Sequence, residues 1–538
     1  MSEKCDIAIL GGGHNGLVCA WYLARAGRSV TVVEKNPVVG GAAVTEEFYP
    51  SFRNSVAAYT VSLLQPGIIA DMDLKRHGLQ MIQRPVGNFW PVEGRAMDGL
   101  VLPNTMLGRQ EAIARFSRND AQRLPAYEAA LERAGALLRE LLLITPPSAG
   151  GGFEDIIKSL KFGKRILDCS LQDKETLCDL FTRSVAGFLE RWFEHDRVRA
   201  ALAFDGIVGT LASPYTPGTA YVLLHHSFGE LDGARGVWGH AIGGMGAITQ
   251  AMAKAAIEAG VRIMTHSTVS EVLHNNSRVM ALKLASGECI EARAVAVNIP
   301  PKLLFRDFLP GLTDTSPAPA RFRQIESGSG SFRMNVALSE LPDFTCLPGT
   351  RQQPHHGAGI IIGPTMEYLD KAWLSARGKG WSEEPVIEMV IPSTIDPSLA
   401  PKGKHVASLF VQHVMPQLPA GRNWKHAHEK EAFSRRVIET VSRYAPNFRS
   451  SILATQSLSP LDIEQRFGMV DGDIFHGQMG PGQLFSLRPV LGAANYKLPV
   501  KGLYLCGAGA HPGGGVTGLP GHNAAREILR DWRKLAKQ

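Results

Sequence analysis

The sequence has few cysteines and no long hydrophobic run. No stretch reaches the about 18 consecutive apolar residues that a transmembrane helix needs, so we expect no membrane-spanning segment. The first expected strand begins near residue 6, which leaves no room for a leader peptide and favours a cytoplasmic protein. No C-x-x-C pair occurs, which argues against a disulfide framework and against dithiol chemistry. The seven cysteines are Cys5, Cys19, Cys169, Cys178, Cys289, Cys346 and Cys506.

Several motifs that mark other protein classes are also missing. The sequence contains no H-E-x-x-H, no P-loop and no G-x-S-x-G, so metalloprotease, kinase and serine hydrolase functions have no support. The 57 basic and 50 acidic residues give a net charge of +7, and the basic residues are dispersed, so we expect no nucleic-acid partner. His225 and His226 are adjacent and, on a strand, would face opposite sides. We therefore expect no metal site.

A complete nucleotide-binding βαβ unit opens the chain. An apolar strand at 7–10 is followed by G-x-G-x-x-G, an apolar helix at 17–26 and a second strand at 29–33. Gly11 allows the tight turn, Gly13 lets the backbone approach a pyrophosphate, and Gly16 lets the helix pack close to the strand. The helix N-terminus then faces the negative charge. The alternative, a structural glycine turn, does not account for the whole ordered set.

An acidic residue closes the second strand. Glu34 can accept hydrogen bonds from a ribose diol and would repel a 2′-phosphate, which favours FAD or NAD over NADP. The pair Gly40 and Gly41 then offers a second approach without a Cβ atom, which a plain NAD domain does not need. The alternative is an ordinary glycine pair in a loop.

The far end of the chain repeats this kind of pattern. A strand at 503–506 leads into the glycine-rich segment GAGAHPGGGVTG, and a helix opens near Pro520. A helix N-terminus at this place can stabilise negative charge on a reduced isoalloxazine ring. Because Pro512 stands where a third glycine would fall, a second dinucleotide turn, and with it a dedicated NAD(P)H domain, is not expected.

These motifs carry a family resemblance. GGGHNG, VVEKNPVVGGAAVTEEF, GGMGAITQAM and GAGAHPGGGVTGLPGHNAA resemble the phytoene desaturase and carotenoid isomerase branch of the FAD-dependent, amine-oxidase-type oxidoreductases. Within it, HNG, LLHHSFGE and GLPGHNAAR are similar to the group of pyridine nucleotide-disulphide oxidoreductase domain-containing protein 2 and its bacterial relatives. The resemblance covers nearly the whole chain.

The resemblance implies an α/β fold with a discontinuous Rossmann-type FAD-binding domain and a substrate domain of mixed sheet plus helices. The cofactor motifs lie at both ends and in the middle of the chain, which predicts an FAD-binding domain from 1–75, 236–310 and 456–538, and a substrate domain from 76–235 and 311–455. FAD is expected to bind without a covalent bond. The predicted cofactor-binding residues are Gly11, Gly13, His14, Asn15, Gly16, Glu34, Lys35, Gly40, Gly41, Ala42, Val269, Asn298, Gly507, Ala508, Gly518, Gly521 and His522.

The chain between these motifs predicts several further elements. A long helix is expected at 122–143, a breaker at 145–152, a helix at 245–259, and strands near Val261, Thr268, Val279 and Glu291. The segment FEDIIKSLKFGKRIL, at 153–167, has the pattern of a basic amphipathic helix that could contact a membrane surface. Lys164 on its apolar face and the interrupting Gly163 favour the alternative, a helix that caps a domain.

Few side chains near the cofactor motifs can handle protons. His511 lies in the loop that should border the isoalloxazine ring and is the candidate catalytic residue. His14 and His522 can instead bond backbone or phosphate. Arg488, in FSLRP, is the candidate anchor for a substrate carboxylate or ketone, with an ion pair at the domain junction as the alternative.

The leading hypothesis is a flavoenzyme that oxidises, desaturates or isomerises an apolar or amphipathic small molecule by hydride transfer to flavin N5. Two other classes stay open at this point: an interaction protein in which FAD is structural, and a dehydrogenase that uses the first βαβ unit for NAD. No motif selects oxygen, a quinone or another carrier as electron acceptor, and none selects an oligomeric state.

Overall fold

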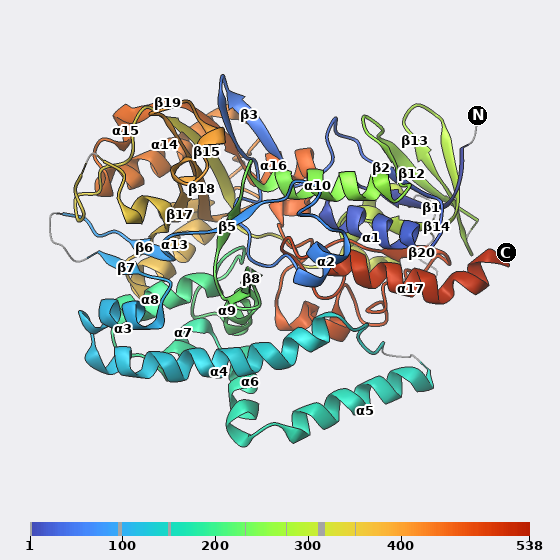
Figure 1. Cartoon of the computed structure of the whole chain (residues 1–538), viewed down its shortest axis with the longest axis horizontal. Coiled ribbons are helices and arrows are strands. Elements are labelled where there is room, and N and C mark those ends of the chain that lie inside the picture. The colour runs from blue at the N-terminus through green and yellow to red at the C-terminus, as the bar shows by residue number, and fades with distance from the viewer. Residues whose placement is uncertain are drawn as a thin grey trace.

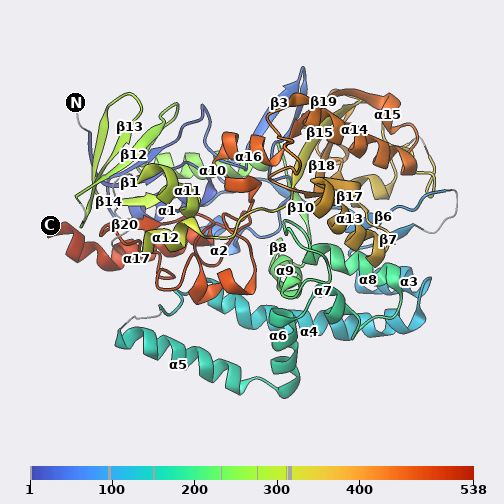
Figure 2. The same ribbon diagram turned by 180° about the vertical axis from the view of Figure 1, so that it is seen from behind.

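The computed structural model describes residues 3–94, 99–148, 152–231, 233–275, 277–309, 312, 318–349 and 351–537. The predicted breaker at 145–152 lies partly outside these residues. Two sheets stand at opposite ends of the molecule, with a layer of helices beneath them (Figure 1). Both ends of the chain lie on the same side, beside the first sheet (Figures 1 and 2).

The first sheet is the nucleotide-binding sheet that the opening motif predicts. Its order is β11-β2-β1-β14-β13-β12, with β20 paired to β14. Strands β11, β2, β1, β14 and β20 run parallel to one another. The pairs β13–β14 and β12–β13 are antiparallel. The strands are β1 (Glu3–Leu10), β2 (Val30–Val33), β11 (Arg262–Met264), β12 (Val269–His274), β13 (Val279–Leu284), β14 (Cys289–Val297) and β20 (Leu503–Leu505).

Three helices from distant parts of the chain cover this sheet. α1 (His14–Arg25) packs against both α10 (Met245–Glu258) and α17 (Leu519–Ala536). α1 begins earlier than the sequence predicts because the glycine turn itself opens the helix, with Gly13 as its N-cap. The start, the middle and the end of the chain therefore build one layer.

The second sheet belongs to the other half of the molecule. Its order is β19-β15-β18-β17-β16-β6-β7, antiparallel except for the parallel pair of β16 and β6. The strands are β6 (Asn88–Trp90), β7 (Leu100–Leu102), β15 (Phe332–Leu338), β16 (Gly359–Ile362), β17 (Trp381–Val390), β18 (His405–Val414) and β19 (Ile452–Leu458). β19 crosses the predicted boundary at 456, because it continues the second sheet before the chain returns.

Short elements link the two halves. Two small strand pairs lie next to both large sheets: β3 pairs with β4, and β5 pairs with β10. These strands are β3 (Thr45–Tyr49), β4 (Phe52–Ser55), β5 (Met81–Gln83) and β10 (Gly239–Ala241), with the small pair β8 (Glu230–Leu231) and β9 (Ala234–Arg235) nearby in sequence. The remaining helices are α2 (Pro66–Asp71), α11 (Pro301–Leu303), α12 (Ala318–Arg323), α13 (Met366–Lys379), α14 (Ala427–Tyr444), α15 (Phe448–Ser451) and α16 (Pro460–Phe467).

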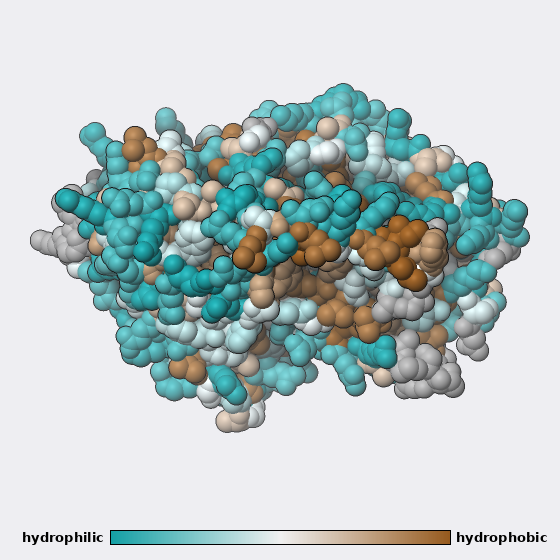
Figure 3. All heavy atoms as spheres, turned by 90° about the horizontal axis from the view of Figure 1, so that it is seen from below, coloured by the Kyte–Doolittle hydropathy of each residue, from teal (hydrophilic) through white to brown (hydrophobic). Residues whose placement is uncertain are grey.

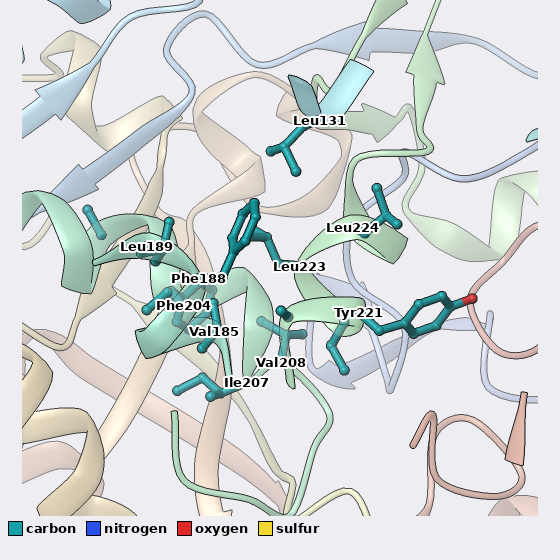
Figure 4. Close-up of a cluster of buried hydrophobic side chains, with 14 of the residues drawn as sticks. Leu131, Val185, Phe188, Leu189, Phe204, Ile207, Val208, Tyr221, Leu223 and Leu224 are labelled. Carbon is teal, nitrogen blue, oxygen red and sulfur yellow. The ribbon is translucent and has the colours of Figure 1, made fainter. Parts of the chain in front are cut away.

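The helical layer surrounds a hydrophobic core that also includes residues of the second sheet and of the C-terminal part of the chain. Leu131, Phe188 and Leu223 from three different helices pack together there (Figure 4). Val208 belongs to the same cluster, whereas Figure 4 shows the hydroxyl of Tyr221 pointing away from it. The helices are α3 (Met106–Ala114), α4 (Arg118–Leu142), α5 (Phe153–Asp168), α6 (Leu171–Thr182), α7 (Val185–Leu189), α8 (Asp196–Ala203) and α9 (Thr219–His226). α4 starts before the predicted residue 122 because Ser117 caps it by accepting the N–H of Asp120.

α5 lies at the edge of the molecule and presents apolar side chains to solvent. Phe153 is 76% exposed, Leu160 is 68% exposed and Leu167 is 74% exposed. Hydrophobic residues form a row across the face seen from below, where α5 lies (Figure 3). The helix exists as predicted; its contact with a membrane surface stays a prediction. Among the described residues, no helix combines the length and apolar character needed to cross a bilayer.

Together these observations confirm the predicted fold class, a mixed α/β molecule with a Rossmann-type domain assembled from separate segments and a second, mixed sheet with helices.

Candidate functional site

The phosphate turn has the geometry that its glycines predict. Gly11 has a φ of +99°, a region that favours glycine. A Cβ atom on Gly16 would lie 2.3 Å from the carbonyl oxygen of Gly11, so α1 can approach the turn only without a side chain there. Gly40 pairs with Gly13 in an isolated bridge, and its N–H donates to the carbonyl of Gly12 at 2.9 Å. Two glycine segments that are distant in sequence thus form one cradle at the N-terminus of α1.

Glu34 lies at the end of β2 and faces this cradle. It is 5% exposed, its Oε2 accepts the N–H of Gly12 at 2.9 Å, and its Oε1 accepts the backbone N–H of Asn36 at 2.9 Å. Oε1 also accepts the side-chain amide of Asn36 at 2.9 Å, so the acceptor capacity that remains is a second hydrogen bond at Oε2. Lys35 follows it and donates its Nζ to the carbonyl of Gln465 at 3.1 Å.

Residues of the C-terminal loop support the cradle by packing. A Cβ atom on Gly507 would lie 3.0 Å from Oδ1 of Asn298, and one on Gly521 would lie 2.0 Å from the carbonyl oxygen of Asn15. Gly518 is the N-cap of α17 with a φ of +76°. The ring of His522 packs on that of Tyr22, with 4.8 Å between centroids. These positions fix α17 against α1.

One large cavity joins the cradle to the second half of the molecule. Its walls include twelve of the predicted cofactor residues: Gly11, Gly13, His14, Asn15, Glu34, Lys35, Gly40, Gly41, Ala42, Val269, Asn298 and Ala508. Beyond them the cavity continues between apolar side chains, among them Leu63, Val208, Trp238, Phe410 and Phe475. Five predicted residues do not line the cavity and instead contribute to the packing described above. They are Gly16, Gly507, Gly518, Gly521 and His522.

His511 and Arg488, the predicted catalytic and substrate residues, also do not line this cavity. The Nε2 atom of His511 lies 3.0 Å from the carbonyl oxygen of Leu141, a contact that holds the C-terminal loop to α4. Burial lowers the pKa of His511 to about 4, so its ring is neutral at physiological pH. This geometry favours a role for His511 in pinning the C-terminal loop to α4 over a catalytic one.

Arg488 is buried and fully engaged with backbone. Its three nitrogen atoms donate to backbone carbonyls that include Ala508, Phe475 and Gly477, at distances from 2.6 to 3.3 Å. Its role is therefore to hold together the loops around the C-terminal segment. Neither the predicted substrate anchor nor the alternative ion pair matches these contacts.

His225 and His226 lie on a helix, which corrects the expectation of a strand. They form the last turn of α9, where the apolar run YVLL is buried against the helical core. Their rings are 5.5 Å apart. Within the part of the chain that the structure describes, no group of three or more histidine, cysteine or acidic residues could hold a metal ion.

His226 alone of this pair lines the cavity. Its Nδ1 atom lies 2.9 Å from the carbonyl oxygens of Asp205 and Val222. Because carbonyl oxygens only accept hydrogen bonds, Nδ1 must carry the proton and Nε2 must present a lone pair. Burial lowers the pKa of His226, so the neutral ring is the stable form.

The sequence interpretation missed a buried polar cluster at the far end of the cavity. The hydroxyl of Tyr59 donates to Glu388, and Arg84 Nη1 lies 3.5 Å from the other oxygen of that carboxylate. The guanidinium of Arg333 stacks on the Tyr59 ring at 4.4 Å from its centroid. A sequence signal existed for Arg333, since it interrupts the apolar strand β15, all of whose residues are buried. No sequence signal existed for Tyr59, Arg84 and Glu388, because the members of the cluster lie far apart in the chain.

Comparisons with known proteins agree with this site. The model of the family described as flavin containing amine oxidoreductase matches residues 16–332. The chain is 38% identical to pyridine nucleotide-disulfide oxidoreductase domain-containing protein 2 of Rattus norvegicus, over 99% of this chain and 95% of that protein. It is 25% identical to a lycopene-forming phytoene desaturase of Pseudescherichia vulneris, over 95% of this chain and 96% of that protein.

A solved structure shares the fold. Cyclohexylamine oxidase from Brevibacterium oxydans superimposes with a TM-score of 0.57 and 16% identity, covering 98% of this chain and 99% of that one. At this identity the likeness concerns the fold alone.

The residues present fit an FAD molecule. Oδ1 of Asn15 and Nε2 of His14 are buried at the N-terminus of α1 without a hydrogen-bond partner among the described residues, and both side chains line the cavity. The cradle is free of Cβ atoms where a pyrophosphate would approach the backbone, and Glu34 stands where the family places its ribose acceptor. The chain belongs to the flavin-containing amine oxidoreductase family and is an FAD-dependent oxidoreductase.

Proposed function

We propose that the protein oxidises, desaturates or isomerises a largely apolar small molecule in the chamber beside the nucleotide cradle. The observation that carries this proposal is the continuity of the cavity, whose walls change from glycines and Glu34 to Leu63, Val208 and Phe475. When bound, FAD supplies a hydride acceptor at N5. One relative is named as a lycopene-forming phytoene desaturase, which supports the proposal.

The protein's own part begins with excluding water from the chamber. Val208 belongs to the hydrophobic core of the helical layer and also lines the cavity, so that core forms one wall of the chamber. Phe410 and Phe475 are buried members of the same core. An apolar substrate would replace water against these surfaces and gain about 25 cal/mol for each Å² of apolar area removed from water.

His226 is the proton acceptor that we assign to the reaction. Two backbone carbonyls hold its Nδ1 atom, which fixes the orientation of the ring. The ring lines the chamber, and its Nε2 atom keeps a free lone pair. A substrate that gives up a hydride also releases a proton in any overall two-electron oxidation, and a neutral imidazole can accept it. This assignment replaces His511, which is held against Leu141.

Anaerobic reduction of the bound flavin tests the proposal. A panel of long-chain alcohols, amines and terpenes is mixed with the yellow protein, and loss of the flavin absorbance is followed by stopped flow. We expect at least one member to reduce the flavin, and His226→Ala to slow that step by about 10²-fold or more, the usual scale for a lost general base. His225→Gln, at the adjacent buried ring that does not line the cavity, is the matched control.

Two outcomes would contradict the proposal. Stoichiometric FAD that no member of the panel reduces would favour the interaction protein with a structural cofactor. Equal reduction rates in wild type and His226→Ala would remove His226 from the proton step. The NAD-linked dehydrogenase is wrong as an alternative, because the family identifies FAD as the cofactor.

A further inference from the structure

We propose that Arg333 binds the carboxylate of the substrate, so that the natural substrate is an amphipathic carboxylic acid with an apolar body. The proposal rests on the proposed function for the placement of the substrate in the chamber. It adds a substrate class that neither the family nor the relatives' names supply.

Arg333 is a buried cation with unused hydrogen-bond donors. It lies on β15, is 2% exposed, and lines the cavity. Its Nη2 donates to Oγ of Ser408 at 2.5 Å. Nε and Nη1 are buried and have no hydrogen-bond partner among the described residues. Leaving such groups unpaired costs free energy, about 1–3 kcal/mol for a neutral donor and more for a charged one.

Two aromatic rings fix the orientation of this guanidinium. Its central carbon lies 4.4 Å from the centroid of the Tyr59 ring and 5.9 Å from that of Phe410, and these two rings stack on each other at 5.6 Å. Tyr59 is in turn held by Glu388 through its hydroxyl. The free edge of Arg333 is therefore positioned before a ligand arrives, which reduces the entropy lost on binding.

No carboxylate of the described residues forms an ion pair with Arg333. The nearest acidic group in the cluster, Glu388, already accepts from Tyr59 and faces Arg84 at 3.5 Å. Burial raises the pKa of Asp205 to about 7, which removes much of its negative charge at neutral pH. Burial lowers the pKa of Arg333 only to about 10, so the guanidinium remains charged. The chamber thus holds an excess positive charge that an anion would balance.

The free edge suits a carboxylate more than a phosphate. Nη2 carries two hydrogens and donates one of them to Ser408, so its second hydrogen and the neighbouring N–H of Nε or Nη1 form an edge of the planar guanidinium that matches the two oxygens of a carboxylate. The lining histidines are neutral, because burial lowers the pKa of His14 to about 4 and that of His476 to about 3, and the charges of Glu34 and Lys35 in the cradle wall are opposite in sign. One unpaired cation balances a monoanion, whereas a phosphate monoester carries about two charges at neutral pH. Apolar side chains such as Leu63, Val208 and Phe475 line much of the rest of the chamber, which assigns the remainder of the ligand to a largely apolar body.

Binding of matched ten-carbon probes tests the proposal in the FAD-loaded protein. Decanoate, decanamide, decylamine and decyl phosphate are titrated near neutral pH, and binding is read from the shift of the flavin absorbance and from calorimetry. We expect decanoate to bind about tenfold to a hundredfold more tightly than decanamide, the range for a charge-assisted hydrogen bond. Decyl phosphate is expected to bind more weakly than decanoate.

Variants connect this preference to the residue. Arg333→Met should retain FAD and lose the preference for decanoate over decanamide, and Arg333→Lys, which keeps the charge but not the fork, should retain part of it. Arg25→Met is the matched control, since Arg25 is an exposed arginine over an aromatic ring, that of Trp21, outside the cavity.

Several results would overturn the proposal. These are equal binding of the four probes to wild type, no binding of any probe to FAD-loaded wild type, tighter binding of decyl phosphate or decylamine, and a preference for decanoate that survives in Arg333→Met. Loss of FAD from Arg333→Met would instead mean that Arg333 serves the cofactor, and it too would count against the proposal. If decanoate binds as expected while no substrate reduces the flavin, the anion site stands and the proposed function fails.

Discussion

Replacing Glu34 by glutamine changes one atom in the cradle and tests how the cofactor is held. The carboxylate accepts N–H groups from Gly12 and Asn36 on its two oxygens, both at 2.9 Å. An amide oxygen can still accept from Asn36, which also donates its side-chain amide to Oε1, but the new NH2 group then faces the N–H of Gly12. The lost bond belongs to the phosphate turn itself.

The structure sets the size of this effect. One charge-assisted hydrogen bond is worth about 1.5–3 kcal/mol, and the ribose acceptor loses its charge as well. We therefore expect the Kd for FAD to rise about tenfold to a hundredfold, where each 1.4 kcal/mol is about a factor of ten. Equilibrium dialysis followed by the visible spectrum measures FAD occupancy. Glu34→Arg should be more severe, because it removes every acceptor and buries a cation beside Lys35.

The control for this experiment is Glu47→Gln, the same change at an exposed position of β3. If dialysed Glu34→Gln keeps as much FAD as the wild type and the Glu47→Gln control do, Glu34 does not hold the ribose. A loss of FAD in both variants would show that the effect is not specific to the cradle.

Three further predictions concern packing and charge. Gly521→Ala would place a Cβ atom 2.0 Å from the Asn15 carbonyl oxygen, so it should lower the free energy of unfolding by about 1–3 kcal/mol and reduce FAD occupancy. Gly163→Ala is the control, because its Cβ would meet nothing within 4 Å. Equal melting temperatures of the two variants would refute the packing argument. His511→Ala should lower thermal stability and leave the rate of flavin reduction per bound FAD near wild type; a slowing of about 10²-fold in fully loaded protein would make His511 catalytic. Asp205 has a pKa raised from 3.8 to about 7 by burial, so its ionisation favours the unfolded chain and wild type loses stability as pH rises through about 7. Asp205→Asn cannot ionise, so its melting temperature should rise relative to wild type between about pH 5 and about pH 8; a constant difference would refute the shift.

The nucleotide-binding half was readable in the sequence because its signals are local. Strand, glycine turn, helix and acid follow one another within residues 3–34, and inside that stretch the N–H of Gly11 donates to the carbonyl of Val33 and the N–H of Gly12 to the carboxylate of Glu34. The same holds for the C-terminal strand and helix. Even here the roles differ in kind, since Gly16 and Gly521 allow close packing of α1, whereas Gly11 and Gly13 line the cavity.

The substrate half was poorly readable because its contacts are distant in sequence. Tyr59 and Glu388 are 329 positions apart, and only the register of β17 in the second sheet brings them together. For His225 and His226 the expectation of a strand was wrong, because an apolar stretch followed by polar residues does not distinguish a short buried helix from a strand. For Arg488, the sequence did not reveal that loop carbonyls surround its side chain.

The placement of α17 against α1 has a consequence for how a cell makes this protein. The glycine turn is made several hundred residues before β20 and α17, which complete its sheet and hold its helix. At about 5–20 residues per second, synthesis leaves the opening turn without these partners for tens of seconds. We therefore expect stable flavin binding only after β20 and α17 have been made and have packed in place. A message truncated before residue 503 would yield a chain that holds no flavin, however intact its opening motif.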